Sequence, residues 1–96
     1  MHIEETYQYT LQYSIHKKTS KINYLGVKRR FQRNGIGRVV VFDFIEKCKS
    51  LGINQIKIDA YTGSIKFWEK MGFTVSKVPQ VIDGYKQDYH DGILKL

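Results

Sequence analysis

The residues best suited to chemistry are the seven from Gln32 to Arg38, which read Gln-Arg-Asn-Gly-Ile-Gly-Arg. Two glycines allow a backbone to turn tightly and to approach a ligand closely. A helix-like run begins at Ile36, so its first N–H groups, which have no acceptor within the helix, are predicted to point back at the turn. Those N–H groups and the helix dipole favour negative charge, and the flanking arginines add to that field. The segment therefore predicts a site for a phosphate or pyrophosphate group.

The spacing of these glycines excludes two common phosphate-binding motifs. A dinucleotide-binding turn needs G-x-G-x-x-G with an acidic residue about twenty positions later, and a P-loop needs G-x-x-x-x-G-K-[ST]. The chain has neither motif. Its own pattern is V-x-x-x-x-Q-x-x-G-x-G-R, in which Val27 ends a predicted strand and Arg38 lies in the first turn of a predicted helix.

This pattern resembles motif A, the acyl-CoA pyrophosphate loop of the GNAT family of N-acetyltransferases. A second block, from Ala60 to Phe73, is similar to that family's motif B, written A-x-x-x-A-x-x-F-Y-E-K-x-G-F. Both blocks stand in the family's order, with a predicted strand between them, which makes the resemblance fairly specific. It covers roughly Tyr7 to Leu96.

The resemblance implies that acetyl-CoA is the cosubstrate and that no metal is needed. Backbone amides from Arg33 to Arg38 would hold the pyrophosphate. The strand from Leu25 to Val27 would pair with the pantetheine amides, and its N–H groups would polarise the thioester carbonyl. The cofactor-binding residues implied in this way are Leu25, Gly26, Val27, Gln32, Arg33, Asn34, Gly35, Ile36, Gly37, Arg38, Ser64, Phe67, Trp68 and Lys70.

The proton donor for the departing thiolate is left open. Where the family usually has a tyrosine, this chain has Trp68, and an indole N–H is a donor without useful acidity. Trp68 could orient a thiol or simply pack beside Phe67. Tyr61 and Ser64 are near enough in sequence to supply a hydroxyl, and a structural role is the alternative for each.

The general base is also unassigned. An amine must lose a proton before it attacks a thioester, so a nearby group or a water chain has to collect that proton. Asp59 has the opposite parity from Ile58 and Ala60 and is predicted to point away from the core. Further candidates, for which surface roles are expected, are Glu4, Glu5, His16 and His90. Desolvation of a neutral amine could suffice without a dedicated base.

Composition and charge bound the remaining possibilities. With 96 residues and 42% hydrophobic content, the chain predicts a single domain, residues 1–96. One cysteine allows no internal disulfide, and no apolar run approaches the length of a membrane span, so a cytoplasmic protein is expected. The net charge is +7, and no acidic residue lies between Thr6 and Phe42. Such a basic face could serve the phosphates of CoA, bind nucleic acid, or maintain solubility.

Hydrophobic periodicity predicts the elements that position the two motifs. Alternation from Tyr7 to Ile15 predicts a half-buried strand, and a second strand is predicted from Lys21 to Val27. In the second strand the apolar parity changes beside Gly26, which indicates a β-bulge or, alternatively, a strand end buried on both faces. A helix is predicted from Ile36 to about Leu51. The further predictions are a strand at Ile56–Ala60, a helix at Ser64–Met71, turns at Asp83-Gly84 and Asp91-Gly92, and a final strand at Ile93–Leu96.

Together these observations predict an α/β fold of the GNAT type, with a mixed central sheet splayed at a bulged strand. The family's usual first strand and two helices, which form one wall of the acceptor site, have no counterpart in the sequence. An exposed aromatic sheet surface would favour a homodimer. The function implied is acetyl transfer from acetyl-CoA to a primary amine of a small molecule or protein. The alternatives are a non-catalytic CoA-binding or regulatory module and a basic nucleic-acid-binding protein.

Overall fold

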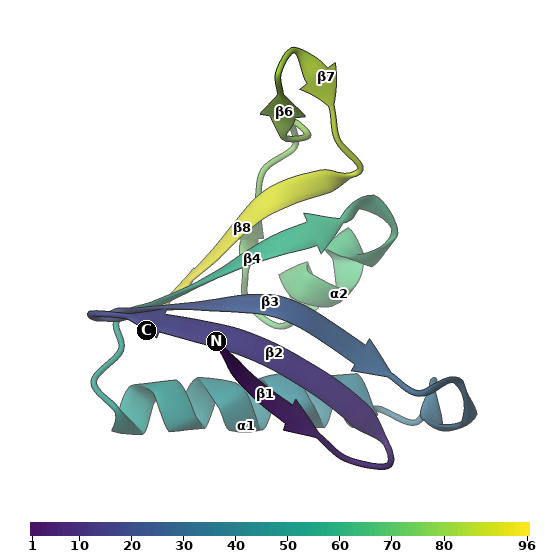
Figure 1. Ribbon diagram of the computed structural model, residues 1–96, viewed down its shortest axis with the longest axis vertical. Helices are drawn as coiled ribbons and strands as arrows, with labels where there is room; N and C mark the ends of the chain where they lie inside the picture. The colour runs from purple at the N-terminus through teal and green to yellow at the C-terminus, as the bar shows by residue number, and fades with distance from the viewer.

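The computed structural model describes all 96 residues and contains two α-helices and a six-stranded sheet (Figure 1). The strands of the sheet follow the order β1-β2-β3-β4-β8-β5, and every neighbouring pair is antiparallel except β3–β4, which is parallel. The elements are β1 (His2–Glu5), β2 (Tyr9–His16), β3 (Thr19–Val27), α1 (Ile36–Ser50), β4 (Gln55–Tyr61), α2 (Ile65–Lys70), β5 (Thr74–Val75), β6 (Val81–Ile82), β7 (Tyr85–Lys86) and β8 (Tyr89–Lys95). Short 3-10 turns span Arg29–Phe31 and Thr62–Ser64.

One face of the sheet carries the core. Along β4, Ile56, Ile58 and Ala60 are buried while the residues between them are exposed or only half-buried. The buried stripe of α1 (Val40, Val41, Phe44 and Cys48) and Trp68 of α2 belong to the same hydrophobic cluster as these strand residues. The opposite face of the sheet bears no helix, and we call it the open face; its residues include Lys21, Tyr24, Lys57, Asp59, Tyr61, Tyr89 and Asp91.

The predicted bulge in β3 is present, but it lies at Asn23 rather than beside Gly26. Tyr13 of β2 pairs with Ile22, and the next residue back along β2, Gln12, pairs with Tyr24, so Asn23 is an extra residue. One extra residue reverses the side-chain parity, which places Leu25 on the same face as Ile22. The parity change in the sequence was therefore a correct sign of a bulge. Gly26 has another role. The Tyr24 ring lies against Gly26, and a Cβ at position 26 would overlap that ring.

The sheet separates at this bulge. The parallel pairing of β3 with β4 runs only from Thr19 and Gln55 to Ile22 and Ile58. Beyond Ile58 the two strands diverge, β3 continuing beside β2 and β4 beside β8 (Figure 1). The predicted splay of a mixed sheet is thereby confirmed, and it leaves one side of β3 without a strand partner from Asn23 onwards.

The prediction of a turn at Asp91-Gly92 is wrong, because both residues lie within β8. Asp91 pairs with Asp59 and Gly92 with Ile58 in a continuous antiparallel ladder. Glycine stands at position 92 because its neighbour fills the space above it: a Cβ there would lie 2.6 Å from Cγ1 of Ile58. Close packing across strands, rather than chain reversal, explains this glycine.

We expect Gly92→Ala to lower the free energy of unfolding by about 1–3 kcal/mol, because the added methyl group overpacks the core against Ile58. Urea unfolding of Gly92→Ala, Ile58→Ala and the double variant measures this. Removing the Ile58 side chain makes room for the methyl group, so the double variant should be more stable than the sum of the two single losses predicts. Strict additivity would contradict this account of Gly92.

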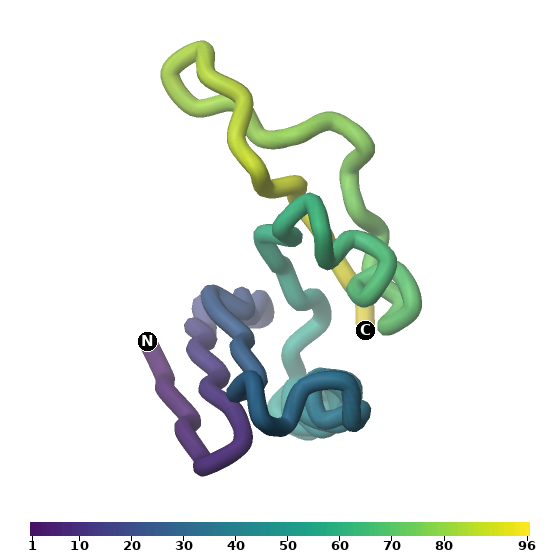
Figure 2. The backbone as a smooth tube through the Cα atoms, turned by 90° about the vertical axis from the view of Figure 1, so that its right-hand side faces the viewer, coloured from purple at the N-terminus to yellow at the C-terminus, as the bar shows by residue number.

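Two further features lie outside the predicted elements. β1, which pairs with β2, has four exposed residues and no apolar alternation that sequence reasoning could detect. β6 and β7 form a hairpin that extends from the body of the molecule (Figure 2). Its two-residue turn is Asp83-Gly84, both with positive φ, which confirms the turn predicted there.

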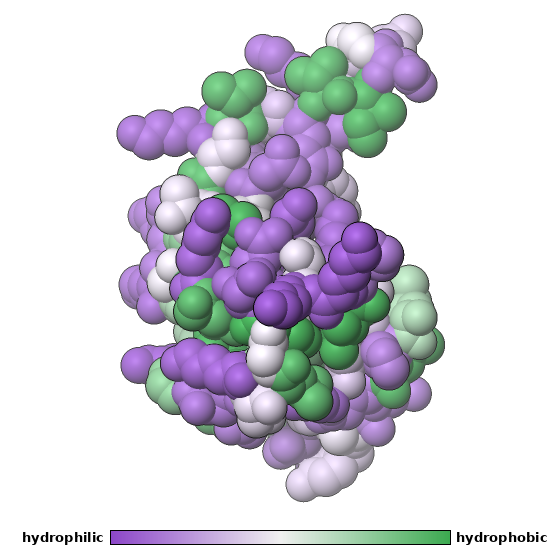
Figure 3. All heavy atoms as spheres, turned by 90° about the vertical axis from the view of Figure 1, so that its left-hand side faces the viewer, coloured by the Kyte–Doolittle hydropathy of each residue, from purple (hydrophilic) through white to green (hydrophobic).

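The surface is mostly hydrophilic in the view of Figure 3, with hydrophobic atoms at the top, where the hairpin lies, and across the middle of the molecule. The exposed apolar residues of this region are Val78, Val81, Ile82 and Tyr85. No helix has the length and apolarity that crossing a membrane requires. No group of three or more His, Cys, Asp or Glu side chains is placed to hold a metal ion.

Candidate functional site

The turn between β3 and α1 presents free backbone donors. Gly35, the N-cap of α1, has φ 76°, and no side chain caps the helix. The first helical hydrogen bond is donated by the Val39 N–H to the Gly35 carbonyl, at 3.1 Å, so the preceding N–H groups of α1 have no backbone acceptor. The Gln32 side-chain amide donates to the Val27 carbonyl at 3.0 Å, which ties the turn to the end of β3. Gln32 thus helps to shape the turn.

A hollow of about 320 Å³ lies over this turn. Most of the residues that the sequence assigned to an anion site line it: Gln32, Arg33, Gly35, Ile36, Gly37 and Arg38, together with Val27, Phe31 and Phe67. Asn34 does not line it. Arg33 has φ 67°, so two left-handed residues, Arg33 and Gly35, curl the backbone within three positions. Successive N–H groups in such a curl converge on a point and favour an anion there.

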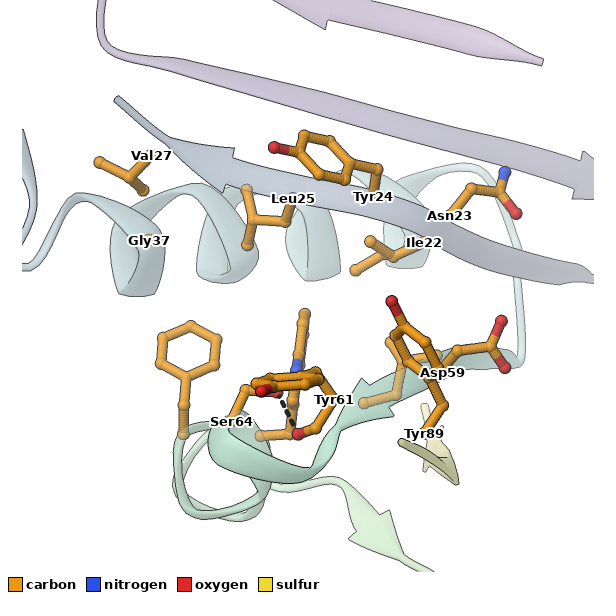
Figure 4. Close-up of a pocket in the computed structure, with 13 residues that line it drawn as sticks. Ile22, Asn23, Tyr24, Leu25, Val27, Gly37, Asp59, Tyr61, Ser64 and Tyr89 are labelled. Atoms are coloured by element: carbon orange, nitrogen blue, oxygen red, sulfur yellow. Dashed lines mark hydrogen bonds between the residues drawn. The ribbon is translucent and has the colours of Figure 1, made fainter. Parts of the chain in front are cut away.

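A cleft of about 420 Å³ opens where β3 and β4 separate (Figure 4). Leu25 and Val27 of β3 line one wall, as the sequence predicted. Gly26 is on the other face of the strand and does not line the cleft. The second wall comes from β4, the 3-10 turn Thr62–Ser64, α2 and β8, and is formed by Ile58, Asp59, Tyr61, Ser64, Phe67, Trp68 and Tyr89.

Phe67 joins the cleft to the turn. It lines the cleft, the hollow over the turn, and a third hollow of about 320 Å³ bordered by Arg38, Lys70 and Met71. Its ring also lies 3.6 Å from the position that a Cβ would take at Gly37. Residues from the two sequence motifs therefore form one continuous surface, and Lys70 borders its third hollow.

Trp68 is chiefly a core residue. It is only 7% exposed, and its ring packs edge to face against Phe67 and Phe73, with centroid distances of 5.1 and 5.2 Å. It also lines the cleft. The Ser64 hydroxyl donates to the Tyr61 carbonyl at 2.8 Å (Figure 4), so the hydroxyl proton of Ser64 already has an acceptor within the chain. Tyr61 is 55% exposed and is the phenol of motif B that borders the cleft.

Most of the candidate bases lie elsewhere. Glu4 accepts a hydrogen bond from the Tyr9 phenol, and this bond is the main reason why the pKa of Tyr9 rises to about 12. Neither Glu4, Glu5, His16 nor the buried His90 lines the cleft; His90 Nδ1 lies 2.8 Å from the Ser76 carbonyl oxygen. Cys48 is fully buried, and burial raises the pKa of its thiol, which makes it an unsuitable nucleophile.

Four polar residues of the cleft were not among the predicted site residues: Asn23, Tyr24, Asp59 and Tyr89. Asp59 carried a usable signal, because its parity already placed it away from the core. Asn23 is the bulge residue itself, and the sequence analysis placed the bulge three residues later, beside Gly26. Tyr89 reaches the cleft only because β8 pairs with β4, a long-range contact that leaves no local mark in the sequence.

Comparison with known proteins gives consistent results. A family model described as an acetyltransferase (GNAT) domain matches residues 9–87. An uncharacterised N-acetyltransferase of Bacillus subtilis, YvbK, is 31% identical over 81 residues, which are 81% of this chain and 51% of that protein. The chain thus spans about half the length of this curated relative.

Solved structures share the fold. A putative N-acetyltransferase from Lactobacillus plantarum aligns with a TM-score of 0.80 at 18% identity, over 93% of this chain and 60% of that one. A Bacillus subtilis acetyltransferase, solved in complex with CoA, aligns with a TM-score of 0.71 at 25% identity, over 92% of this chain and 67% of that one.

Proposed function

Because the chain belongs to the GNAT family of acetyltransferases, we propose that it transfers an acetyl group from acetyl-CoA to a primary amine of an acceptor. The observation that carries this proposal is the continuous surface from the free amides at the start of α1 to the cleft between β3 and β4. Its two ends differ in character: one offers backbone N–H donors and arginines, and the other is a largely apolar slot.

In this arrangement the pyrophosphate lies over the turn, held by the N–H groups between Arg33 and Arg38. The pantetheine arm enters the cleft, where Leu25 and Val27 provide apolar contacts and one side of the β3 backbone has no strand partner. The third hollow, with Arg38 and Lys70, receives the adenosine end. Phe67 packs against the ligand at the bend between these parts.

Acetyl transfer requires donors for a developing oxyanion. The N–H groups of β3 between Leu25 and Val27 that point away from β2 supply them, because they are fixed in the strand before the reaction begins. The amine nitrogen attacks the thioester carbon, a tetrahedral intermediate forms, and the C–S bond breaks to release CoA. Trp68 holds the wall of the cleft and does not donate the proton.

We also propose a cytoplasmic protein whose open face is covered by the acceptor or by a second copy of the chain. Three tyrosines on that face, Tyr24, Tyr61 and Tyr89, are exposed, which supports such a contact. Sedimentation equilibrium at micromolar concentration, with and without acetyl-CoA, distinguishes a monomer from a homodimer.

The experiment that tests the function combines two measurements. Isothermal titration with acetyl-CoA measures binding, and free-thiol release in the presence of butylamine, glycinamide, L-lysine and polylysine measures transfer. Saturable binding with thiol release on at least one amine supports the enzyme. Binding without turnover on any of them would contradict acetyl transfer to these amines and support the second candidate, a non-catalytic CoA-binding module, which the tryptophan at position 68 favours.

A nucleic-acid-binding protein makes a different prediction. The basic residues near the turn, among them Lys28, Arg29 and Arg30, would then bind RNA or DNA with an affinity that falls steeply as salt rises. That affinity would survive mutation of Gly35 and Gly37, whereas CoA binding would not.

A further inference from the structure

We propose that Asp59 accepts the proton that the acceptor amine loses before attack, and that Gln80 positions its carboxylate. This inference rests on the proposed acetyl transfer. It assigns the general base, which the sequence left open, to a residue at the point where the sheet separates.

The position of Asp59 is set by the splay. Ile58 is the last residue of β4 that pairs with β3, so Asp59 is the first residue of β4 without a β3 partner. It lines the cleft, and it also lines a hollow of about 510 Å³ on the open face of the sheet. Figure 4 shows it at the end of the cleft beside Tyr89. Asp59 therefore stands between the proposed thioester site and the face from which an acceptor can approach.

No other residue of the cleft can play this role. Among its 13 lining residues Asp59 is the one carboxylate, and none is a histidine. The remaining ionisable side chains of the cleft are the phenols of Tyr24, Tyr61 and Tyr89, whose O–H groups are hydrogen-bond donors.

The carboxylate is held in one orientation. Lys21 Nζ lies 3.0 Å from Oδ2, and Gln80 Nε2 donates to Oδ1 at 2.8 Å. The same Gln80 amide donates to Asp91 Oδ1 at 3.0 Å, so it bridges two aspartates that face each other across β4 and β8. Gln80 is itself anchored, because its backbone N–H donates to the Tyr89 carbonyl at 2.8 Å. A carboxylate accepts about four hydrogen bonds, so these contacts leave capacity for a proton.

The charged and titratable groups around Asp59 come from each neighbouring element. They are Lys21 of β3, Lys57 and Tyr61 of β4, and Tyr89 and Asp91 of β8. Lys21 forms an ion pair with Asp59, and Asp91 lies opposite Asp59 on the neighbouring strand. Asp59 thus offers a negative charge at the cleft to an ammonium group that arrives over the open face.

The proton balance is as follows. A protonated amine gives one proton to Asp59, and this proton then passes to bulk water through the hollow on the open face. The neutral amine forms the N–C bond while the carbonyl becomes an oxyanion. When the C–S bond breaks, the nitrogen gives up its second proton, which reaches the departing sulfur through solvent. The products are the acetylated amine, CoA as a thiol, and one proton in water.

The test compares Asp59→Asn with Asp91→Asn, using the amine of the panel above that wild type acetylates fastest. Both variants remove one negative charge from the same face and keep an oxygen for Gln80, but only Asp59 lines the cleft. We expect Asp59→Asn to lower kcat about 100-fold at pH 7, within the range of general-base effects. The Kd for acetyl-CoA should change less than about twofold, since no cofactor contact is removed. Asp91→Asn should keep kcat within about threefold of wild type.

The pH dependence separates a base from a structural residue. An amine needs no base once it is neutral, so the deficit of Asp59→Asn should shrink as the pH approaches the pKa of the amine, about 10.4 for a lysine-like group. A structural defect would persist at every pH. Gln80→Leu should lower kcat less than Asp59→Asn, with the same dependence on pH, because it loosens the carboxylate without removing it.

An equal loss in the two aspartate variants, or a deficit in Asp59→Asn that does not change with pH, would overturn the inference. Full activity of Asp59→Asn beside an active wild type would overturn it while leaving the proposed function in place. If wild type acetylates none of the amines, the proposed function fails, and the role of Asp59 fails with it.

Discussion

Replacing both Gly35 and Gly37 with valine is expected to weaken acetyl-CoA binding about 100-fold, measured by isothermal titration. Gly35 has φ 76°, a conformation that a β-branched residue adopts only with strain, so the turn would shift. At Gly37 the added side chain meets Phe67 and Val27 at ordinary contact distance and fills space beside the proposed phosphate site. Loss of two charge-assisted hydrogen bonds to phosphate, at about 1.5 kcal/mol each, gives this factor.

Gly52 provides a matched control for the backbone strain. Its φ is 75°, and like Gly35 it has open space where a Cβ would stand. It lies beyond the end of α1, at the opposite end of the helix from the turn. Gly35→Val and Gly52→Val should therefore lose similar amounts of stability, while only the former loses affinity. If the double variant bound acetyl-CoA as tightly as wild type, the proposed pyrophosphate site would be wrong.

Trp68→Ala is expected to destabilise the protein by about 3–5 kcal/mol in urea unfolding, because a large buried ring leaves a cavity that the core cannot fill. The ring is 7% exposed and packs against Phe67 and Phe73. Small domains have about 5–15 kcal/mol of total stability. This variant should thus be marginally folded, and its loss of activity would say little about chemistry.

Trp68→Phe resolves the chemical question at this position. It keeps an aromatic ring between Phe67 and Phe73 and removes only the indole N–H and part of the ring. If Trp68 serves packing alone, the variant should acetylate an amine within about threefold of the wild-type kcat, since no proton-transfer step is lost. A loss of 100-fold in kcat, with acetyl-CoA affinity preserved, would show that the indole N–H takes part in the reaction.

The parts of the fold that could be predicted are those whose signals are local. The turn at Gly35 and Gly37 follows from glycine spacing, and α1 follows from an apolar stripe of helical period. The Asp83-Gly84 turn follows from the positive φ that both residues tolerate, and the structure has both. The alternating strands β2 and β4 follow from burial on one face alone.

The features that could not be predicted depend on contacts between distant segments. Asp91-Gly92 has the composition of a turn, but packing against Ile58 of the neighbouring strand decides its conformation. β1 has no apolar pattern and is held by pairing with β2. The residues around Asp59 come from β3, the loop before β6, and β8, so no single stretch of sequence could have predicted this arrangement.

The extra residue in β3 lies where β3 separates from β4, but the inward-facing hydrophobic pattern of the strand continues on both sides of it. The side chains that anchor it inward, Ile22, Leu25 and Val27, stand two positions apart once Asn23 is left out of the count, so their hydrophobic pattern does not need the insertion. The access that we propose for the cofactor begins where that insertion lies. A lineage could thus gain or lose ligand entry through one codon while its interior stayed intact. Alignments that treat a single-residue gap here as noise would miss a change in the proposed cofactor entry.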